Sequence, residues 1–255
     1  MKKTFLNYDY PLLTTMVQAD TPQKIKFLMH KSLSLGAEAF GMQFERLKSE
    51  FKDTATLKDL FAYAKDVPVY FTNYRFGENE GKSDEVLAEE LLNLAKAGGT
   101  LCDVMGDYFD AQPGELTMDK AAIDKQVELI NKIHAEGCEV LMSSHIHKFT
   151  PAERVLEIAL EHQKRGADIS KIVTGAETRD EQIENLKILN LLKQNLKIPF
   201  LFLINSESGE SHIFRRIAGE FGNCMYLVVC QHDEFSTVLQ PLLANVKAIR
   251  DNLKK

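Results

Sequence analysis

Short apolar runs alternate with longer segments of helical periodicity along the chain. Eight such runs occur, and most are followed by a helical segment. Short runs that are apolar on both faces are typical of parallel strands buried between helices. We predict eight strands, at Leu12–Val17, Ala37–Phe44, Pro68–Thr72, Leu101–Met105, Glu139–Ser143, Lys171–Thr174, Ile198–Ile204 and Met225–Cys230.

The segments between these runs carry apolar residues at i, i+3 and i+4, the spacing of one helix face. Ser83 is placed to cap the helix that follows it, and Pro151 suits a first helical turn. We predict helices at Pro22–Leu35, Leu57–Lys65, Asp84–Ala97, Asp119–Ala135, Pro151–Lys164, Arg179–Gln194, Ile213–Phe221 and Thr237–Asn252.

Eight strand–helix repeats in 255 residues predict a (β/α)₈ barrel. A doubly wound open sheet is the alternative, but no glycine-rich dinucleotide fingerprint follows any strand. No low-complexity linker interrupts the chain, so we expect residues 1–255 to form one domain. In a barrel, functional groups gather at the carboxyl ends of the strands.

Composition narrows the classes of function. Hydrophobic residues make up 44% and charged residues 27%, as in ordinary globular proteins. A formal net charge of −6 argues against a dedicated nucleic-acid binder. The apolar runs are too short to span a membrane, and the first ten residues lack the apolar core of a signal peptide. Four cysteines without metal-ligand spacing favour free thiols in a reducing cytoplasm.

The segment Glu139–Lys171 is a strand–helix–strand unit with polar groups at both strands. It places His145 just past one strand and Lys171 at the start of the next, so that both can face one pocket. A buried lysine can form a Schiff base with a ketone while a histidine moves protons. The alternatives are a lysine that reaches solvent and a loop histidine bonded to backbone. His145 and His147 as metal ligands lack further ligands at fixed spacing.

Other polar residues follow the predicted strands. Arg75 ends the third strand and precedes an acidic loop. A carboxylate of this loop could orient the histidine, but the residues alone favour a solvated acidic turn. The loop 206–212 enters a helix with Arg215 and Arg216, an arrangement that favours an anion but also occurs on ordinary surface helices. Ser236 and Gln240 add hydrogen-bonding groups after the last strand.

Taken together, these residues resemble the type I 3-dehydroquinate dehydratases, over nearly the whole chain. The combination of motifs, in this order and spacing, is far more specific than any one of them. The segments that carry the resemblance are Ser143-Ser-His145, Lys148-Phe-Thr-Pro151, Gly166-Ala-Asp-Ile-Ser-Lys171-Ile, Arg216-Ile-Ala-Gly-Glu-Phe-Gly222 and Ser236-x-x-x-Gln240.

The resemblance implies a homodimeric (β/α)₈ barrel of the shikimate pathway that needs no metal or organic cofactor. It would convert 3-dehydroquinate to 3-dehydroshikimate and water by syn elimination, with no nucleic-acid or membrane partner. By position, Lys171 would be the Schiff-base lysine and His145 the proton-transfer residue. Glu80 matches the acidic partner of the histidine, with Glu78 as the alternative. The implied substrate-binding residues are Arg75, Arg216, Ser236, Gln240 and Gln43.

The chain departs from the family pattern at a few pocket positions. Gly41-Met-Gln43 stands where the family usually has Glu-x-Arg, and Asp103-Val-Met105 where it often has Asp-x-Glu. Ile146 replaces an aspartate after the histidine. These changes keep two alternatives open: a related Schiff-base lyase or aldolase acting on another carboxylated ketone, and a non-catalytic ligand-binding paralogue.

Overall fold

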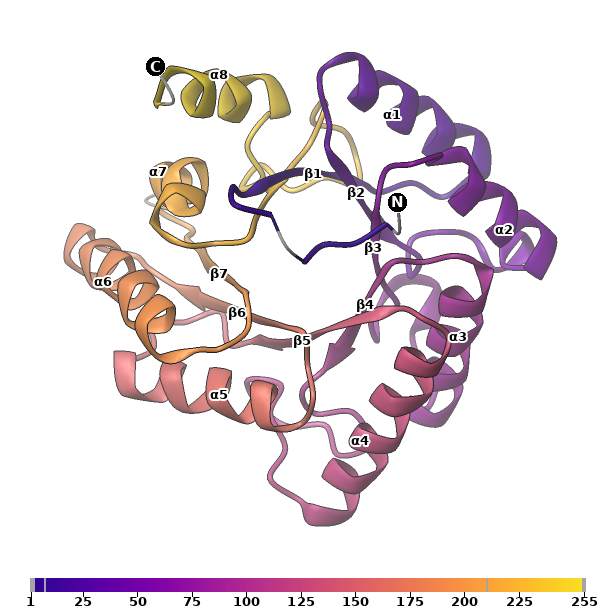
Figure 1. Cartoon of the computed structure of the whole chain (residues 1–255), viewed down its shortest axis with the longest axis horizontal. Helices are drawn as coiled ribbons and strands as arrows, with labels where there is room; N and C mark the ends of the chain where they lie inside the picture. The colour runs from indigo at the N-terminus through magenta and orange to yellow at the C-terminus, as the bar shows by residue number, and fades with distance from the viewer. Residues whose placement is uncertain (1–2, 7, 210, 254–255) are drawn as a thin grey trace.

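The computed structural model describes residues 3–6, 8–209 and 211–253, and its strands surround a central axis inside a ring of helices (Figure 1). Eight strands form one parallel sheet in the order β7-β6-β5-β4-β3-β2-β1-β8. The ends of that order, β7 and β8, are linked by Asn223, whose side chain accepts from Phe202 N at 2.7 Å and donates to Phe202 O at 2.8 Å. The predicted (β/α)₈ barrel is therefore confirmed, as a nearly closed barrel.

The strands of the barrel are short and almost entirely buried. They are β1 (Leu12–Val17), β2 (Ala39–Gln43), β3 (Val69–Thr72), β4 (Leu101–Met105), β5 (Glu139–His145), β6 (Ile169–Gly175), β7 (Phe200–Asn205) and β8 (Met225–Val228).

Most helices begin at a side chain that caps the first turn, such as Ser83, which accepts from Val86 N. The α-helices are α1 (Pro22–Ser34), α2 (Thr54–Tyr63), α3 (Asp84–Ala97), α4 (Lys120–Ala135), α5 (Ala152–Lys164), α6 (Arg179–Asn195), α7 (Ser211–Ile217) and α8 (Leu243–Leu253). The short 3-10 helices are η1 (Ser49–Phe51), η2 (Gly77–Asn79) and η3 (Ala218–Phe221).

The structure corrects the predicted bounds of three elements that concern the site. Strand β5 runs through His145, which the sequence placed just past the strand, and β6 begins at Ile169, so Lys171 is its third residue. The last helix begins at Leu243 instead of Thr237. Residues before it pair with Val229, just past β8: Val229 N donates to Pro241 O at 3.0 Å, and this pairing delays the helix.

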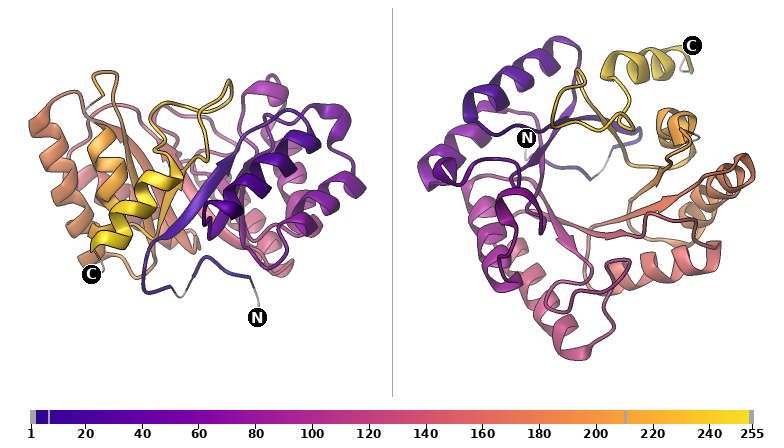
Figure 2. Two further views of the ribbon diagram at one scale, coloured as in Figure 1. Left: turned by 90° about the horizontal axis from the view of Figure 1, so that it is seen from above. Right: turned by 180° about the vertical axis from the view of Figure 1, so that it is seen from behind.

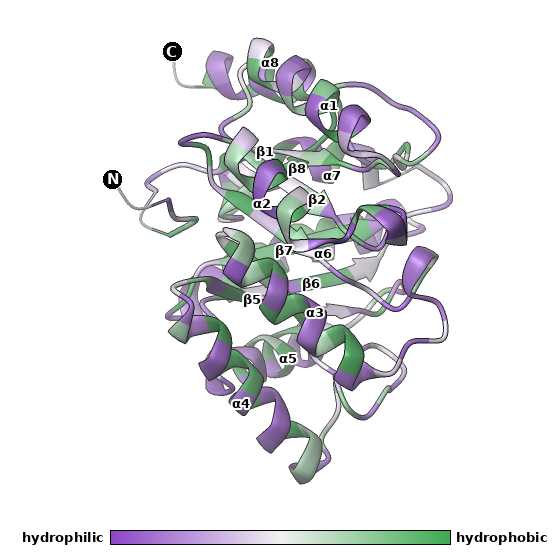
Figure 3. Cartoon of the chain, turned by 90° about the vertical axis from the view of Figure 1, so that its right-hand side faces the viewer, coloured by the Kyte–Doolittle hydropathy of each residue, from purple (hydrophilic) through white to green (hydrophobic). Residues whose placement is uncertain are grey.

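The core has two parts, inside the barrel and between barrel and helices. Apolar helix faces turn toward the strands, with polar faces outward (Figure 3). Phe5, in the segment before β1, belongs to the interior cluster, and its N–H donates to Glu139 Oε2 at 2.8 Å. This segment lies at the opposite end of the barrel from the loop after β8 (Figure 2), which leaves the carboxyl ends of the strands for a site.

None of the helices within the described residues is long and apolar enough to cross a membrane.

Candidate active site

A cavity of about 580 Å³ opens at the carboxyl ends of the barrel strands. Six of the eight residues proposed from the sequence line it, from β2, β5, β6 and the loops after β3 and β8. They are Lys171, His145, Gln43, Arg75, Ser236 and Gln240. The other two, Glu80 and Arg216, are not among its lining residues.

Lys171 points into the barrel because side chains alternate along β6. Its neighbours at the same spacing, Ile169 and Val173, belong to the interior cluster. The Lys171 side chain is 5% exposed, and its Nζ lies 3.1 Å from Asp103 Oδ2 on β4. A buried ammonium needs such a partner, since desolvation without one is costly. The alternative of a lysine that reaches solvent is wrong.

The His145 ring lies in the same cavity, and its Nδ1 is 2.5 Å from Glu115 Oε2. A carboxylate only accepts, so Nδ1–H donates and the Nε2 lone pair is the one left to take a proton. Glu115 sits in the loop before α4 at φ +51°. Ser144 Oγ fixes that loop by donating to Glu115 O at 2.7 Å.

The prediction that Glu80 partners the histidine is wrong in this structure. Glu80 is exposed at the end of η2, which turns its side chain away from the barrel. The alternative, Glu78, is also exposed, and its Oε2 accepts from Ser49 N at 3.1 Å. The sequence offered no pattern for Glu115, which lies in an irregular loop, 30 residues before His145.

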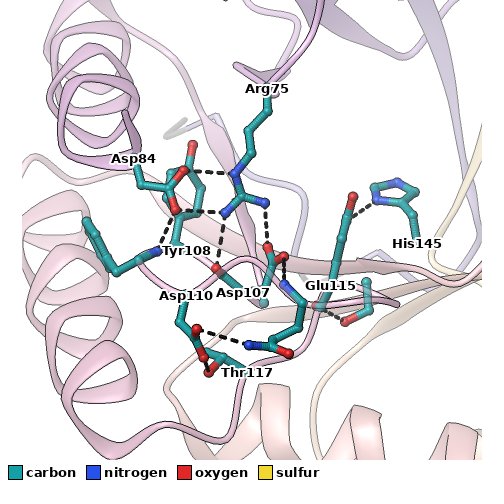
Figure 4. A network of polar contacts seen from close by, with 12 residues as sticks. Arg75, Asp84, Asp107, Tyr108, Asp110, Glu115, Thr117 and His145 are labelled. Carbon is teal, nitrogen blue, oxygen red and sulfur yellow. Dashed lines mark hydrogen bonds and ion pairs between the residues drawn. The ribbon is translucent and has the colours of Figure 1, made fainter. Parts of the chain in front are cut away.

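Arg75 is held by two acids instead of standing free for a substrate (Figure 4). Its Nε and Nη2 donate to the two oxygens of Asp84, each at 2.8 Å, and its Nη1 donates to Asp107 Oδ1 at 2.8 Å. Burial disfavours the charged form of Arg75, but the bonds to Asp84 and Asp107 outweigh burial and raise the pKa of Arg75 above its ordinary value. Asp107 also accepts from Gln112 N, so Arg75 anchors the loop that carries Glu115.

The cation that faces the cavity from α7 is Arg215, not the predicted Arg216. Arg215 is buried, and its Nε donates to Ile204 O at 2.8 Å. Among the described residues no acid forms an ion pair with it, and burial lowers its pKa to about 10. Arg216 is half-buried and donates to the carbonyl of His212. One residue turns a helix by about 100°, so a motif match alone does not set which arginine points inward.

On the side of the cavity formed by β1, β2 and the loop after β8, amide groups and a guanidinium carry polar atoms without a hydrogen-bond partner among the described residues. Gln18 Nε2 donates to Gln43 Oε1 at 2.5 Å. Three lining residues each bury a polar atom that has no partner among the described residues: Gln18 Oε1, Gln240 Oε1 and Arg46 Nε. Gln18 and Arg46 were not predicted, since both lie just beyond their strands.

The altered second strand makes room for larger neighbours. A Cβ at Gly41 would lie 2.3 Å from Met16 Sδ and 3.1 Å from Tyr70 Cδ1. Glycine therefore allows the Met16 and Tyr70 side chains to fill the space where the family usually has an acid. Met105 also lines the cavity. The change at Gly41 is thus coupled to the packing of two strands.

His147 contacts the site without a ligand set for a metal. Its ring stacks on His145 with centroids 5.8 Å apart, and its Nδ1 accepts from Asn205 Nδ2 at 2.9 Å. Burial, then the neighbouring His145, lowers the pKa of His147. Within the described part of the chain, no group of three or more His, Cys, Asp or Glu residues could hold a metal ion.

The chain matches the family model for type I 3-dehydroquinase over residues 13–238. A 3-dehydroquinate dehydratase of Clostridium novyi (strain NT) is 29% identical over 185 residues, 71% of this chain and 68% of that protein. The one from Alkaliphilus oremlandii (strain OhILAs) is 36% identical over 112 residues, 43% of this chain and 42% of that protein.

Solved structures support the same fold. The 3-dehydroquinate dehydratase from Geobacillus kaustophilus HTA426 superposes with a TM-score of 0.82 at 15% identity, over 99% of this chain and 96% of that one. The type I enzyme from Clostridium difficile, solved with covalently modified comenic acid, gives 0.78 at 17% identity, over 96% and 93%. The chain belongs to the type I 3-dehydroquinase family, a family of hydro-lyases.

Proposed function

We propose that this chain converts 3-dehydroquinate to 3-dehydroshikimate through a Schiff base on Lys171. The observation that carries the proposal is that Lys171 and His145, on adjacent strands, line one cavity. Family membership supplies the substrate class, and the cavity supplies an amine, an imidazole and cations for a carboxylate.

In the proposed reaction, the ring ketone condenses with the Lys171 amine and releases water, leaving a cationic iminium. The cation acidifies the adjacent carbon, and His145 Nε2 removes its proton. The same imidazolium then protonates the departing hydroxyl, so water leaves on the face from which the proton came. Hydrolysis of the iminium releases the product and the free lysine.

The remaining roles follow from the contacts. Glu115 orients the His145 ring and stabilises the imidazolium through its bond to Nδ1. Arg215, Ser236 and Gln240 are proposed to hold the carboxylate, with Gln43, Gln18 and Arg46 on the ring hydroxyls. Arg75 is proposed to act through the loop that it anchors. We further propose that residues 1–255 form a single domain that works as a homodimer in the cytoplasm, without metal or organic cofactor.

A direct assay tests this function. The purified chain is mixed with 3-dehydroquinate, and the ultraviolet absorbance of the enone product is followed. We expect turnover in the wild type and none for Lys171→Ala. Lys187→Ala is the matched control, because Lys187 pairs with Glu184 on the surface of α6 and should leave turnover unchanged. Full activity of Lys171→Ala, or an inactive wild type, would contradict the proposal.

The altered wall favours one alternative, a Schiff-base lyase or aldolase acting on another carboxylated ketone. Gly41 and Met105 remove polar groups from the wall, and Tyr70 takes up space beside Gly41. A panel of carboxylated ketones separates the two: this alternative requires a panel member to be turned over faster than 3-dehydroquinate.

A further inference from the structure

The Lys171 amine is enclosed by three oxygen atoms from β3, β4 and the loop after β3. Its Nζ lies 2.6 Å from Tyr74 Oη, 3.1 Å from Tyr70 Oη and 3.1 Å from Asp103 Oδ2. All four side chains are buried, Tyr74 the most exposed at 8%. An ammonium has three N–H donors, so each one finds an acceptor here.

The hydroxyl protons of both tyrosines point to the same carboxylate. Tyr74 Oη donates to Asp103 Oδ2 at 2.5 Å, Tyr70 Oη also donates to it, and Ser143 Oγ donates to Oδ1 at 2.5 Å. Burial, then the charge of Asp103, raises the pKa of both tyrosines well above the ordinary value. Burial opposes ionisation of Asp103, but Lys171, His145 and the donated bonds hold its pKa below the ordinary value.

This arrangement fits an ammonium–carboxylate pair at rest, and an ammonium has no lone pair with which to attack a ketone. The proton must therefore leave Lys171 before the covalent step. The shortest contact of the amine is with Tyr74 Oη, at 2.6 Å, and Tyr74 Oη lies 2.5 Å from the carboxylate. Tyr70 Oη and the carboxylate itself are each 3.1 Å from the amine.

We propose that Tyr74 is a catalytic residue that relays a proton between Lys171 and Asp103 during Schiff-base formation. The proposal rests on the proposed function of the site. Lys171 gives one proton to Tyr74 as Tyr74 gives its own to Asp103, which leaves a neutral amine and a neutral carboxylic acid. The amine then adds to the ketone carbon, and a proton moves from nitrogen to oxygen to give the carbinolamine.

The reverse relay completes the step without any outside reactant. Asp103 returns its proton through Tyr74 to the carbinolamine hydroxyl, which leaves as water as the C=N bond forms. The resulting iminium cation then faces the Asp103 carboxylate again, so the charge pair of the resting site is restored. No net proton enters or leaves the site.

Tyr70 does not share this position, although it carries the same group. Only Tyr74 also packs its ring edge on His145, with centroids 5.4 Å apart and planes at 85°. Tyr70 lies deeper, beside Gly41. The titratable or charged groups facing Tyr74 are Tyr70, Asp103, His145, Lys171 and Glu45, whose Oε2 accepts from Tyr74 N at 3.3 Å.

The test measures how fast the covalent adduct on Lys171 forms at pH 6 to 9, by rapid quench and borohydride reduction. With the relay, the amine loses its proton inside the site, so the wild-type rate should change little with pH. Tyr74→Phe should form the adduct about 100-fold more slowly near neutral pH. Its rate should rise with pH, because the amine must then lose its proton to solvent.

Two matched tyrosines serve as comparisons. Tyr70→Phe should keep the flat pH profile with a smaller loss of rate. In the wild type the Tyr226 hydroxyl bonds Glu220 outside the cavity, so Tyr226→Phe should match the wild type.

A flat pH profile of adduct formation for Tyr74→Phe, or the same steep profile for Tyr70→Phe, would overturn the relay. If Tyr74→Phe fails to fold, Asp103→Asn removes the acceptor and should give the same steep profile; a flat one overturns the relay. A wild type that forms no adduct would contradict the proposed function itself.

Discussion

The two sides of the cavity differ in how far their polar groups are already satisfied. Around Lys171 the amine, carboxylate and hydroxyls bond to one another. On the β1, β2 and β8 side of the cavity, Gln18 and Gln240 each bury an acceptor atom without a partner among the described residues. Arg215, on α7, bonds Ile204 O and has no acid partner among the described residues. Buried polar atoms without partners are rare in folded proteins. The difference indicates that one side is built for reaction and the other for a polar ligand.

The largest effect on turnover should come from removing the imidazole of His145, the proton-transfer group beside Lys171. We expect His145→Ala to lower kcat by about 10²–10⁴-fold, because its Nε2 is the group that moves protons in the proposed pathway. Adduct formation on Lys171 should persist. Steady-state kinetics and reductive trapping check both results, with Glu115→Gln as the milder companion, at roughly 10- to 150-fold. Unchanged kcat in His145→Ala would remove His145 from the pathway.

The next effect concerns Glu45, which lies fully buried behind Tyr74. Its carboxyl accepts from Thr72 Oγ1 at 2.9 Å, and burial raises its pKa to about 7. Because the pKa of Glu45 is higher in the folded state, that state still binds a proton at pH values where the unfolded state has lost it. The contribution of Glu45 to the free energy of unfolding therefore falls as pH rises from 4.5 to 7 and is constant above pH 7. Glu45→Gln should remove this fall, on the order of 3 kcal/mol.

Urea unfolding at pH 5 and pH 8 measures the Glu45 effect. The wild type should lose stability between these pH values relative to Glu45→Gln. Glu90→Gln is the control of opposite sign: burial disfavours its charge, but bonds from Lys82 and Asn73 lower its pKa, so its contribution is lost only toward acid pH. Parallel curves for wild type and Glu45→Gln would contradict the expectation.

On the ligand side, Arg215→Met and Arg216→Met separate two adjacent arginines. We expect Arg215→Met to raise KM for 3-dehydroquinate roughly 10- to 150-fold, the loss of about 1.5–3 kcal/mol for a hydrogen bond to a charged group. Arg216→Met should leave KM nearly unchanged, since its bond to the His212 carbonyl keeps it out of the cavity lining. The opposite order would restore the assignment made from the sequence.

The smallest effect should come from Gln240. Gln240→Leu removes a buried amide whose oxygen has no partner among the described residues, so stability should change little while KM rises by about 2- to 12-fold. Asn185→Leu is the matched control: its amide donates to Glu181 O at 2.9 Å, so it should cost stability and leave KM unchanged. Melting curves and steady-state kinetics on both variants test whether Gln240 serves ligand binding while Asn185 serves stability.

The sequence predicted the regular parts of the molecule well because periodicity reports burial. The bounds of β1, α3 and β4 agree with the predicted residues. The strand–helix–strand unit correctly brought Lys171 and His145 to one cavity, since adjacent parallel strands fix their own register. Tyr70 and Tyr74 lie within and just past an apolar run, and no motif marks either residue, although strand alternation places them on one face.

The errors lie where irregular backbone or helix rotation decides which way a side chain points. Glu80 fitted the motif, but η2 turns it outward. Glu115 reaches His145 from a loop held by Arg75 and Asp107, a contact that no local pattern encodes. Arg215 and Arg216 differ by one helical step. Such positions depend on tertiary packing and cannot be derived from spacing.

The most direct test of the covalent role of Lys171 is borohydride reduction of the wild-type chain in the presence of 3-dehydroquinate, followed by peptide mass spectrometry. We predict one reduced adduct, on Lys171, with inactivation in proportion to labelling. Dehydration that continues without an adduct, or an adduct on a different lysine, would contradict that role.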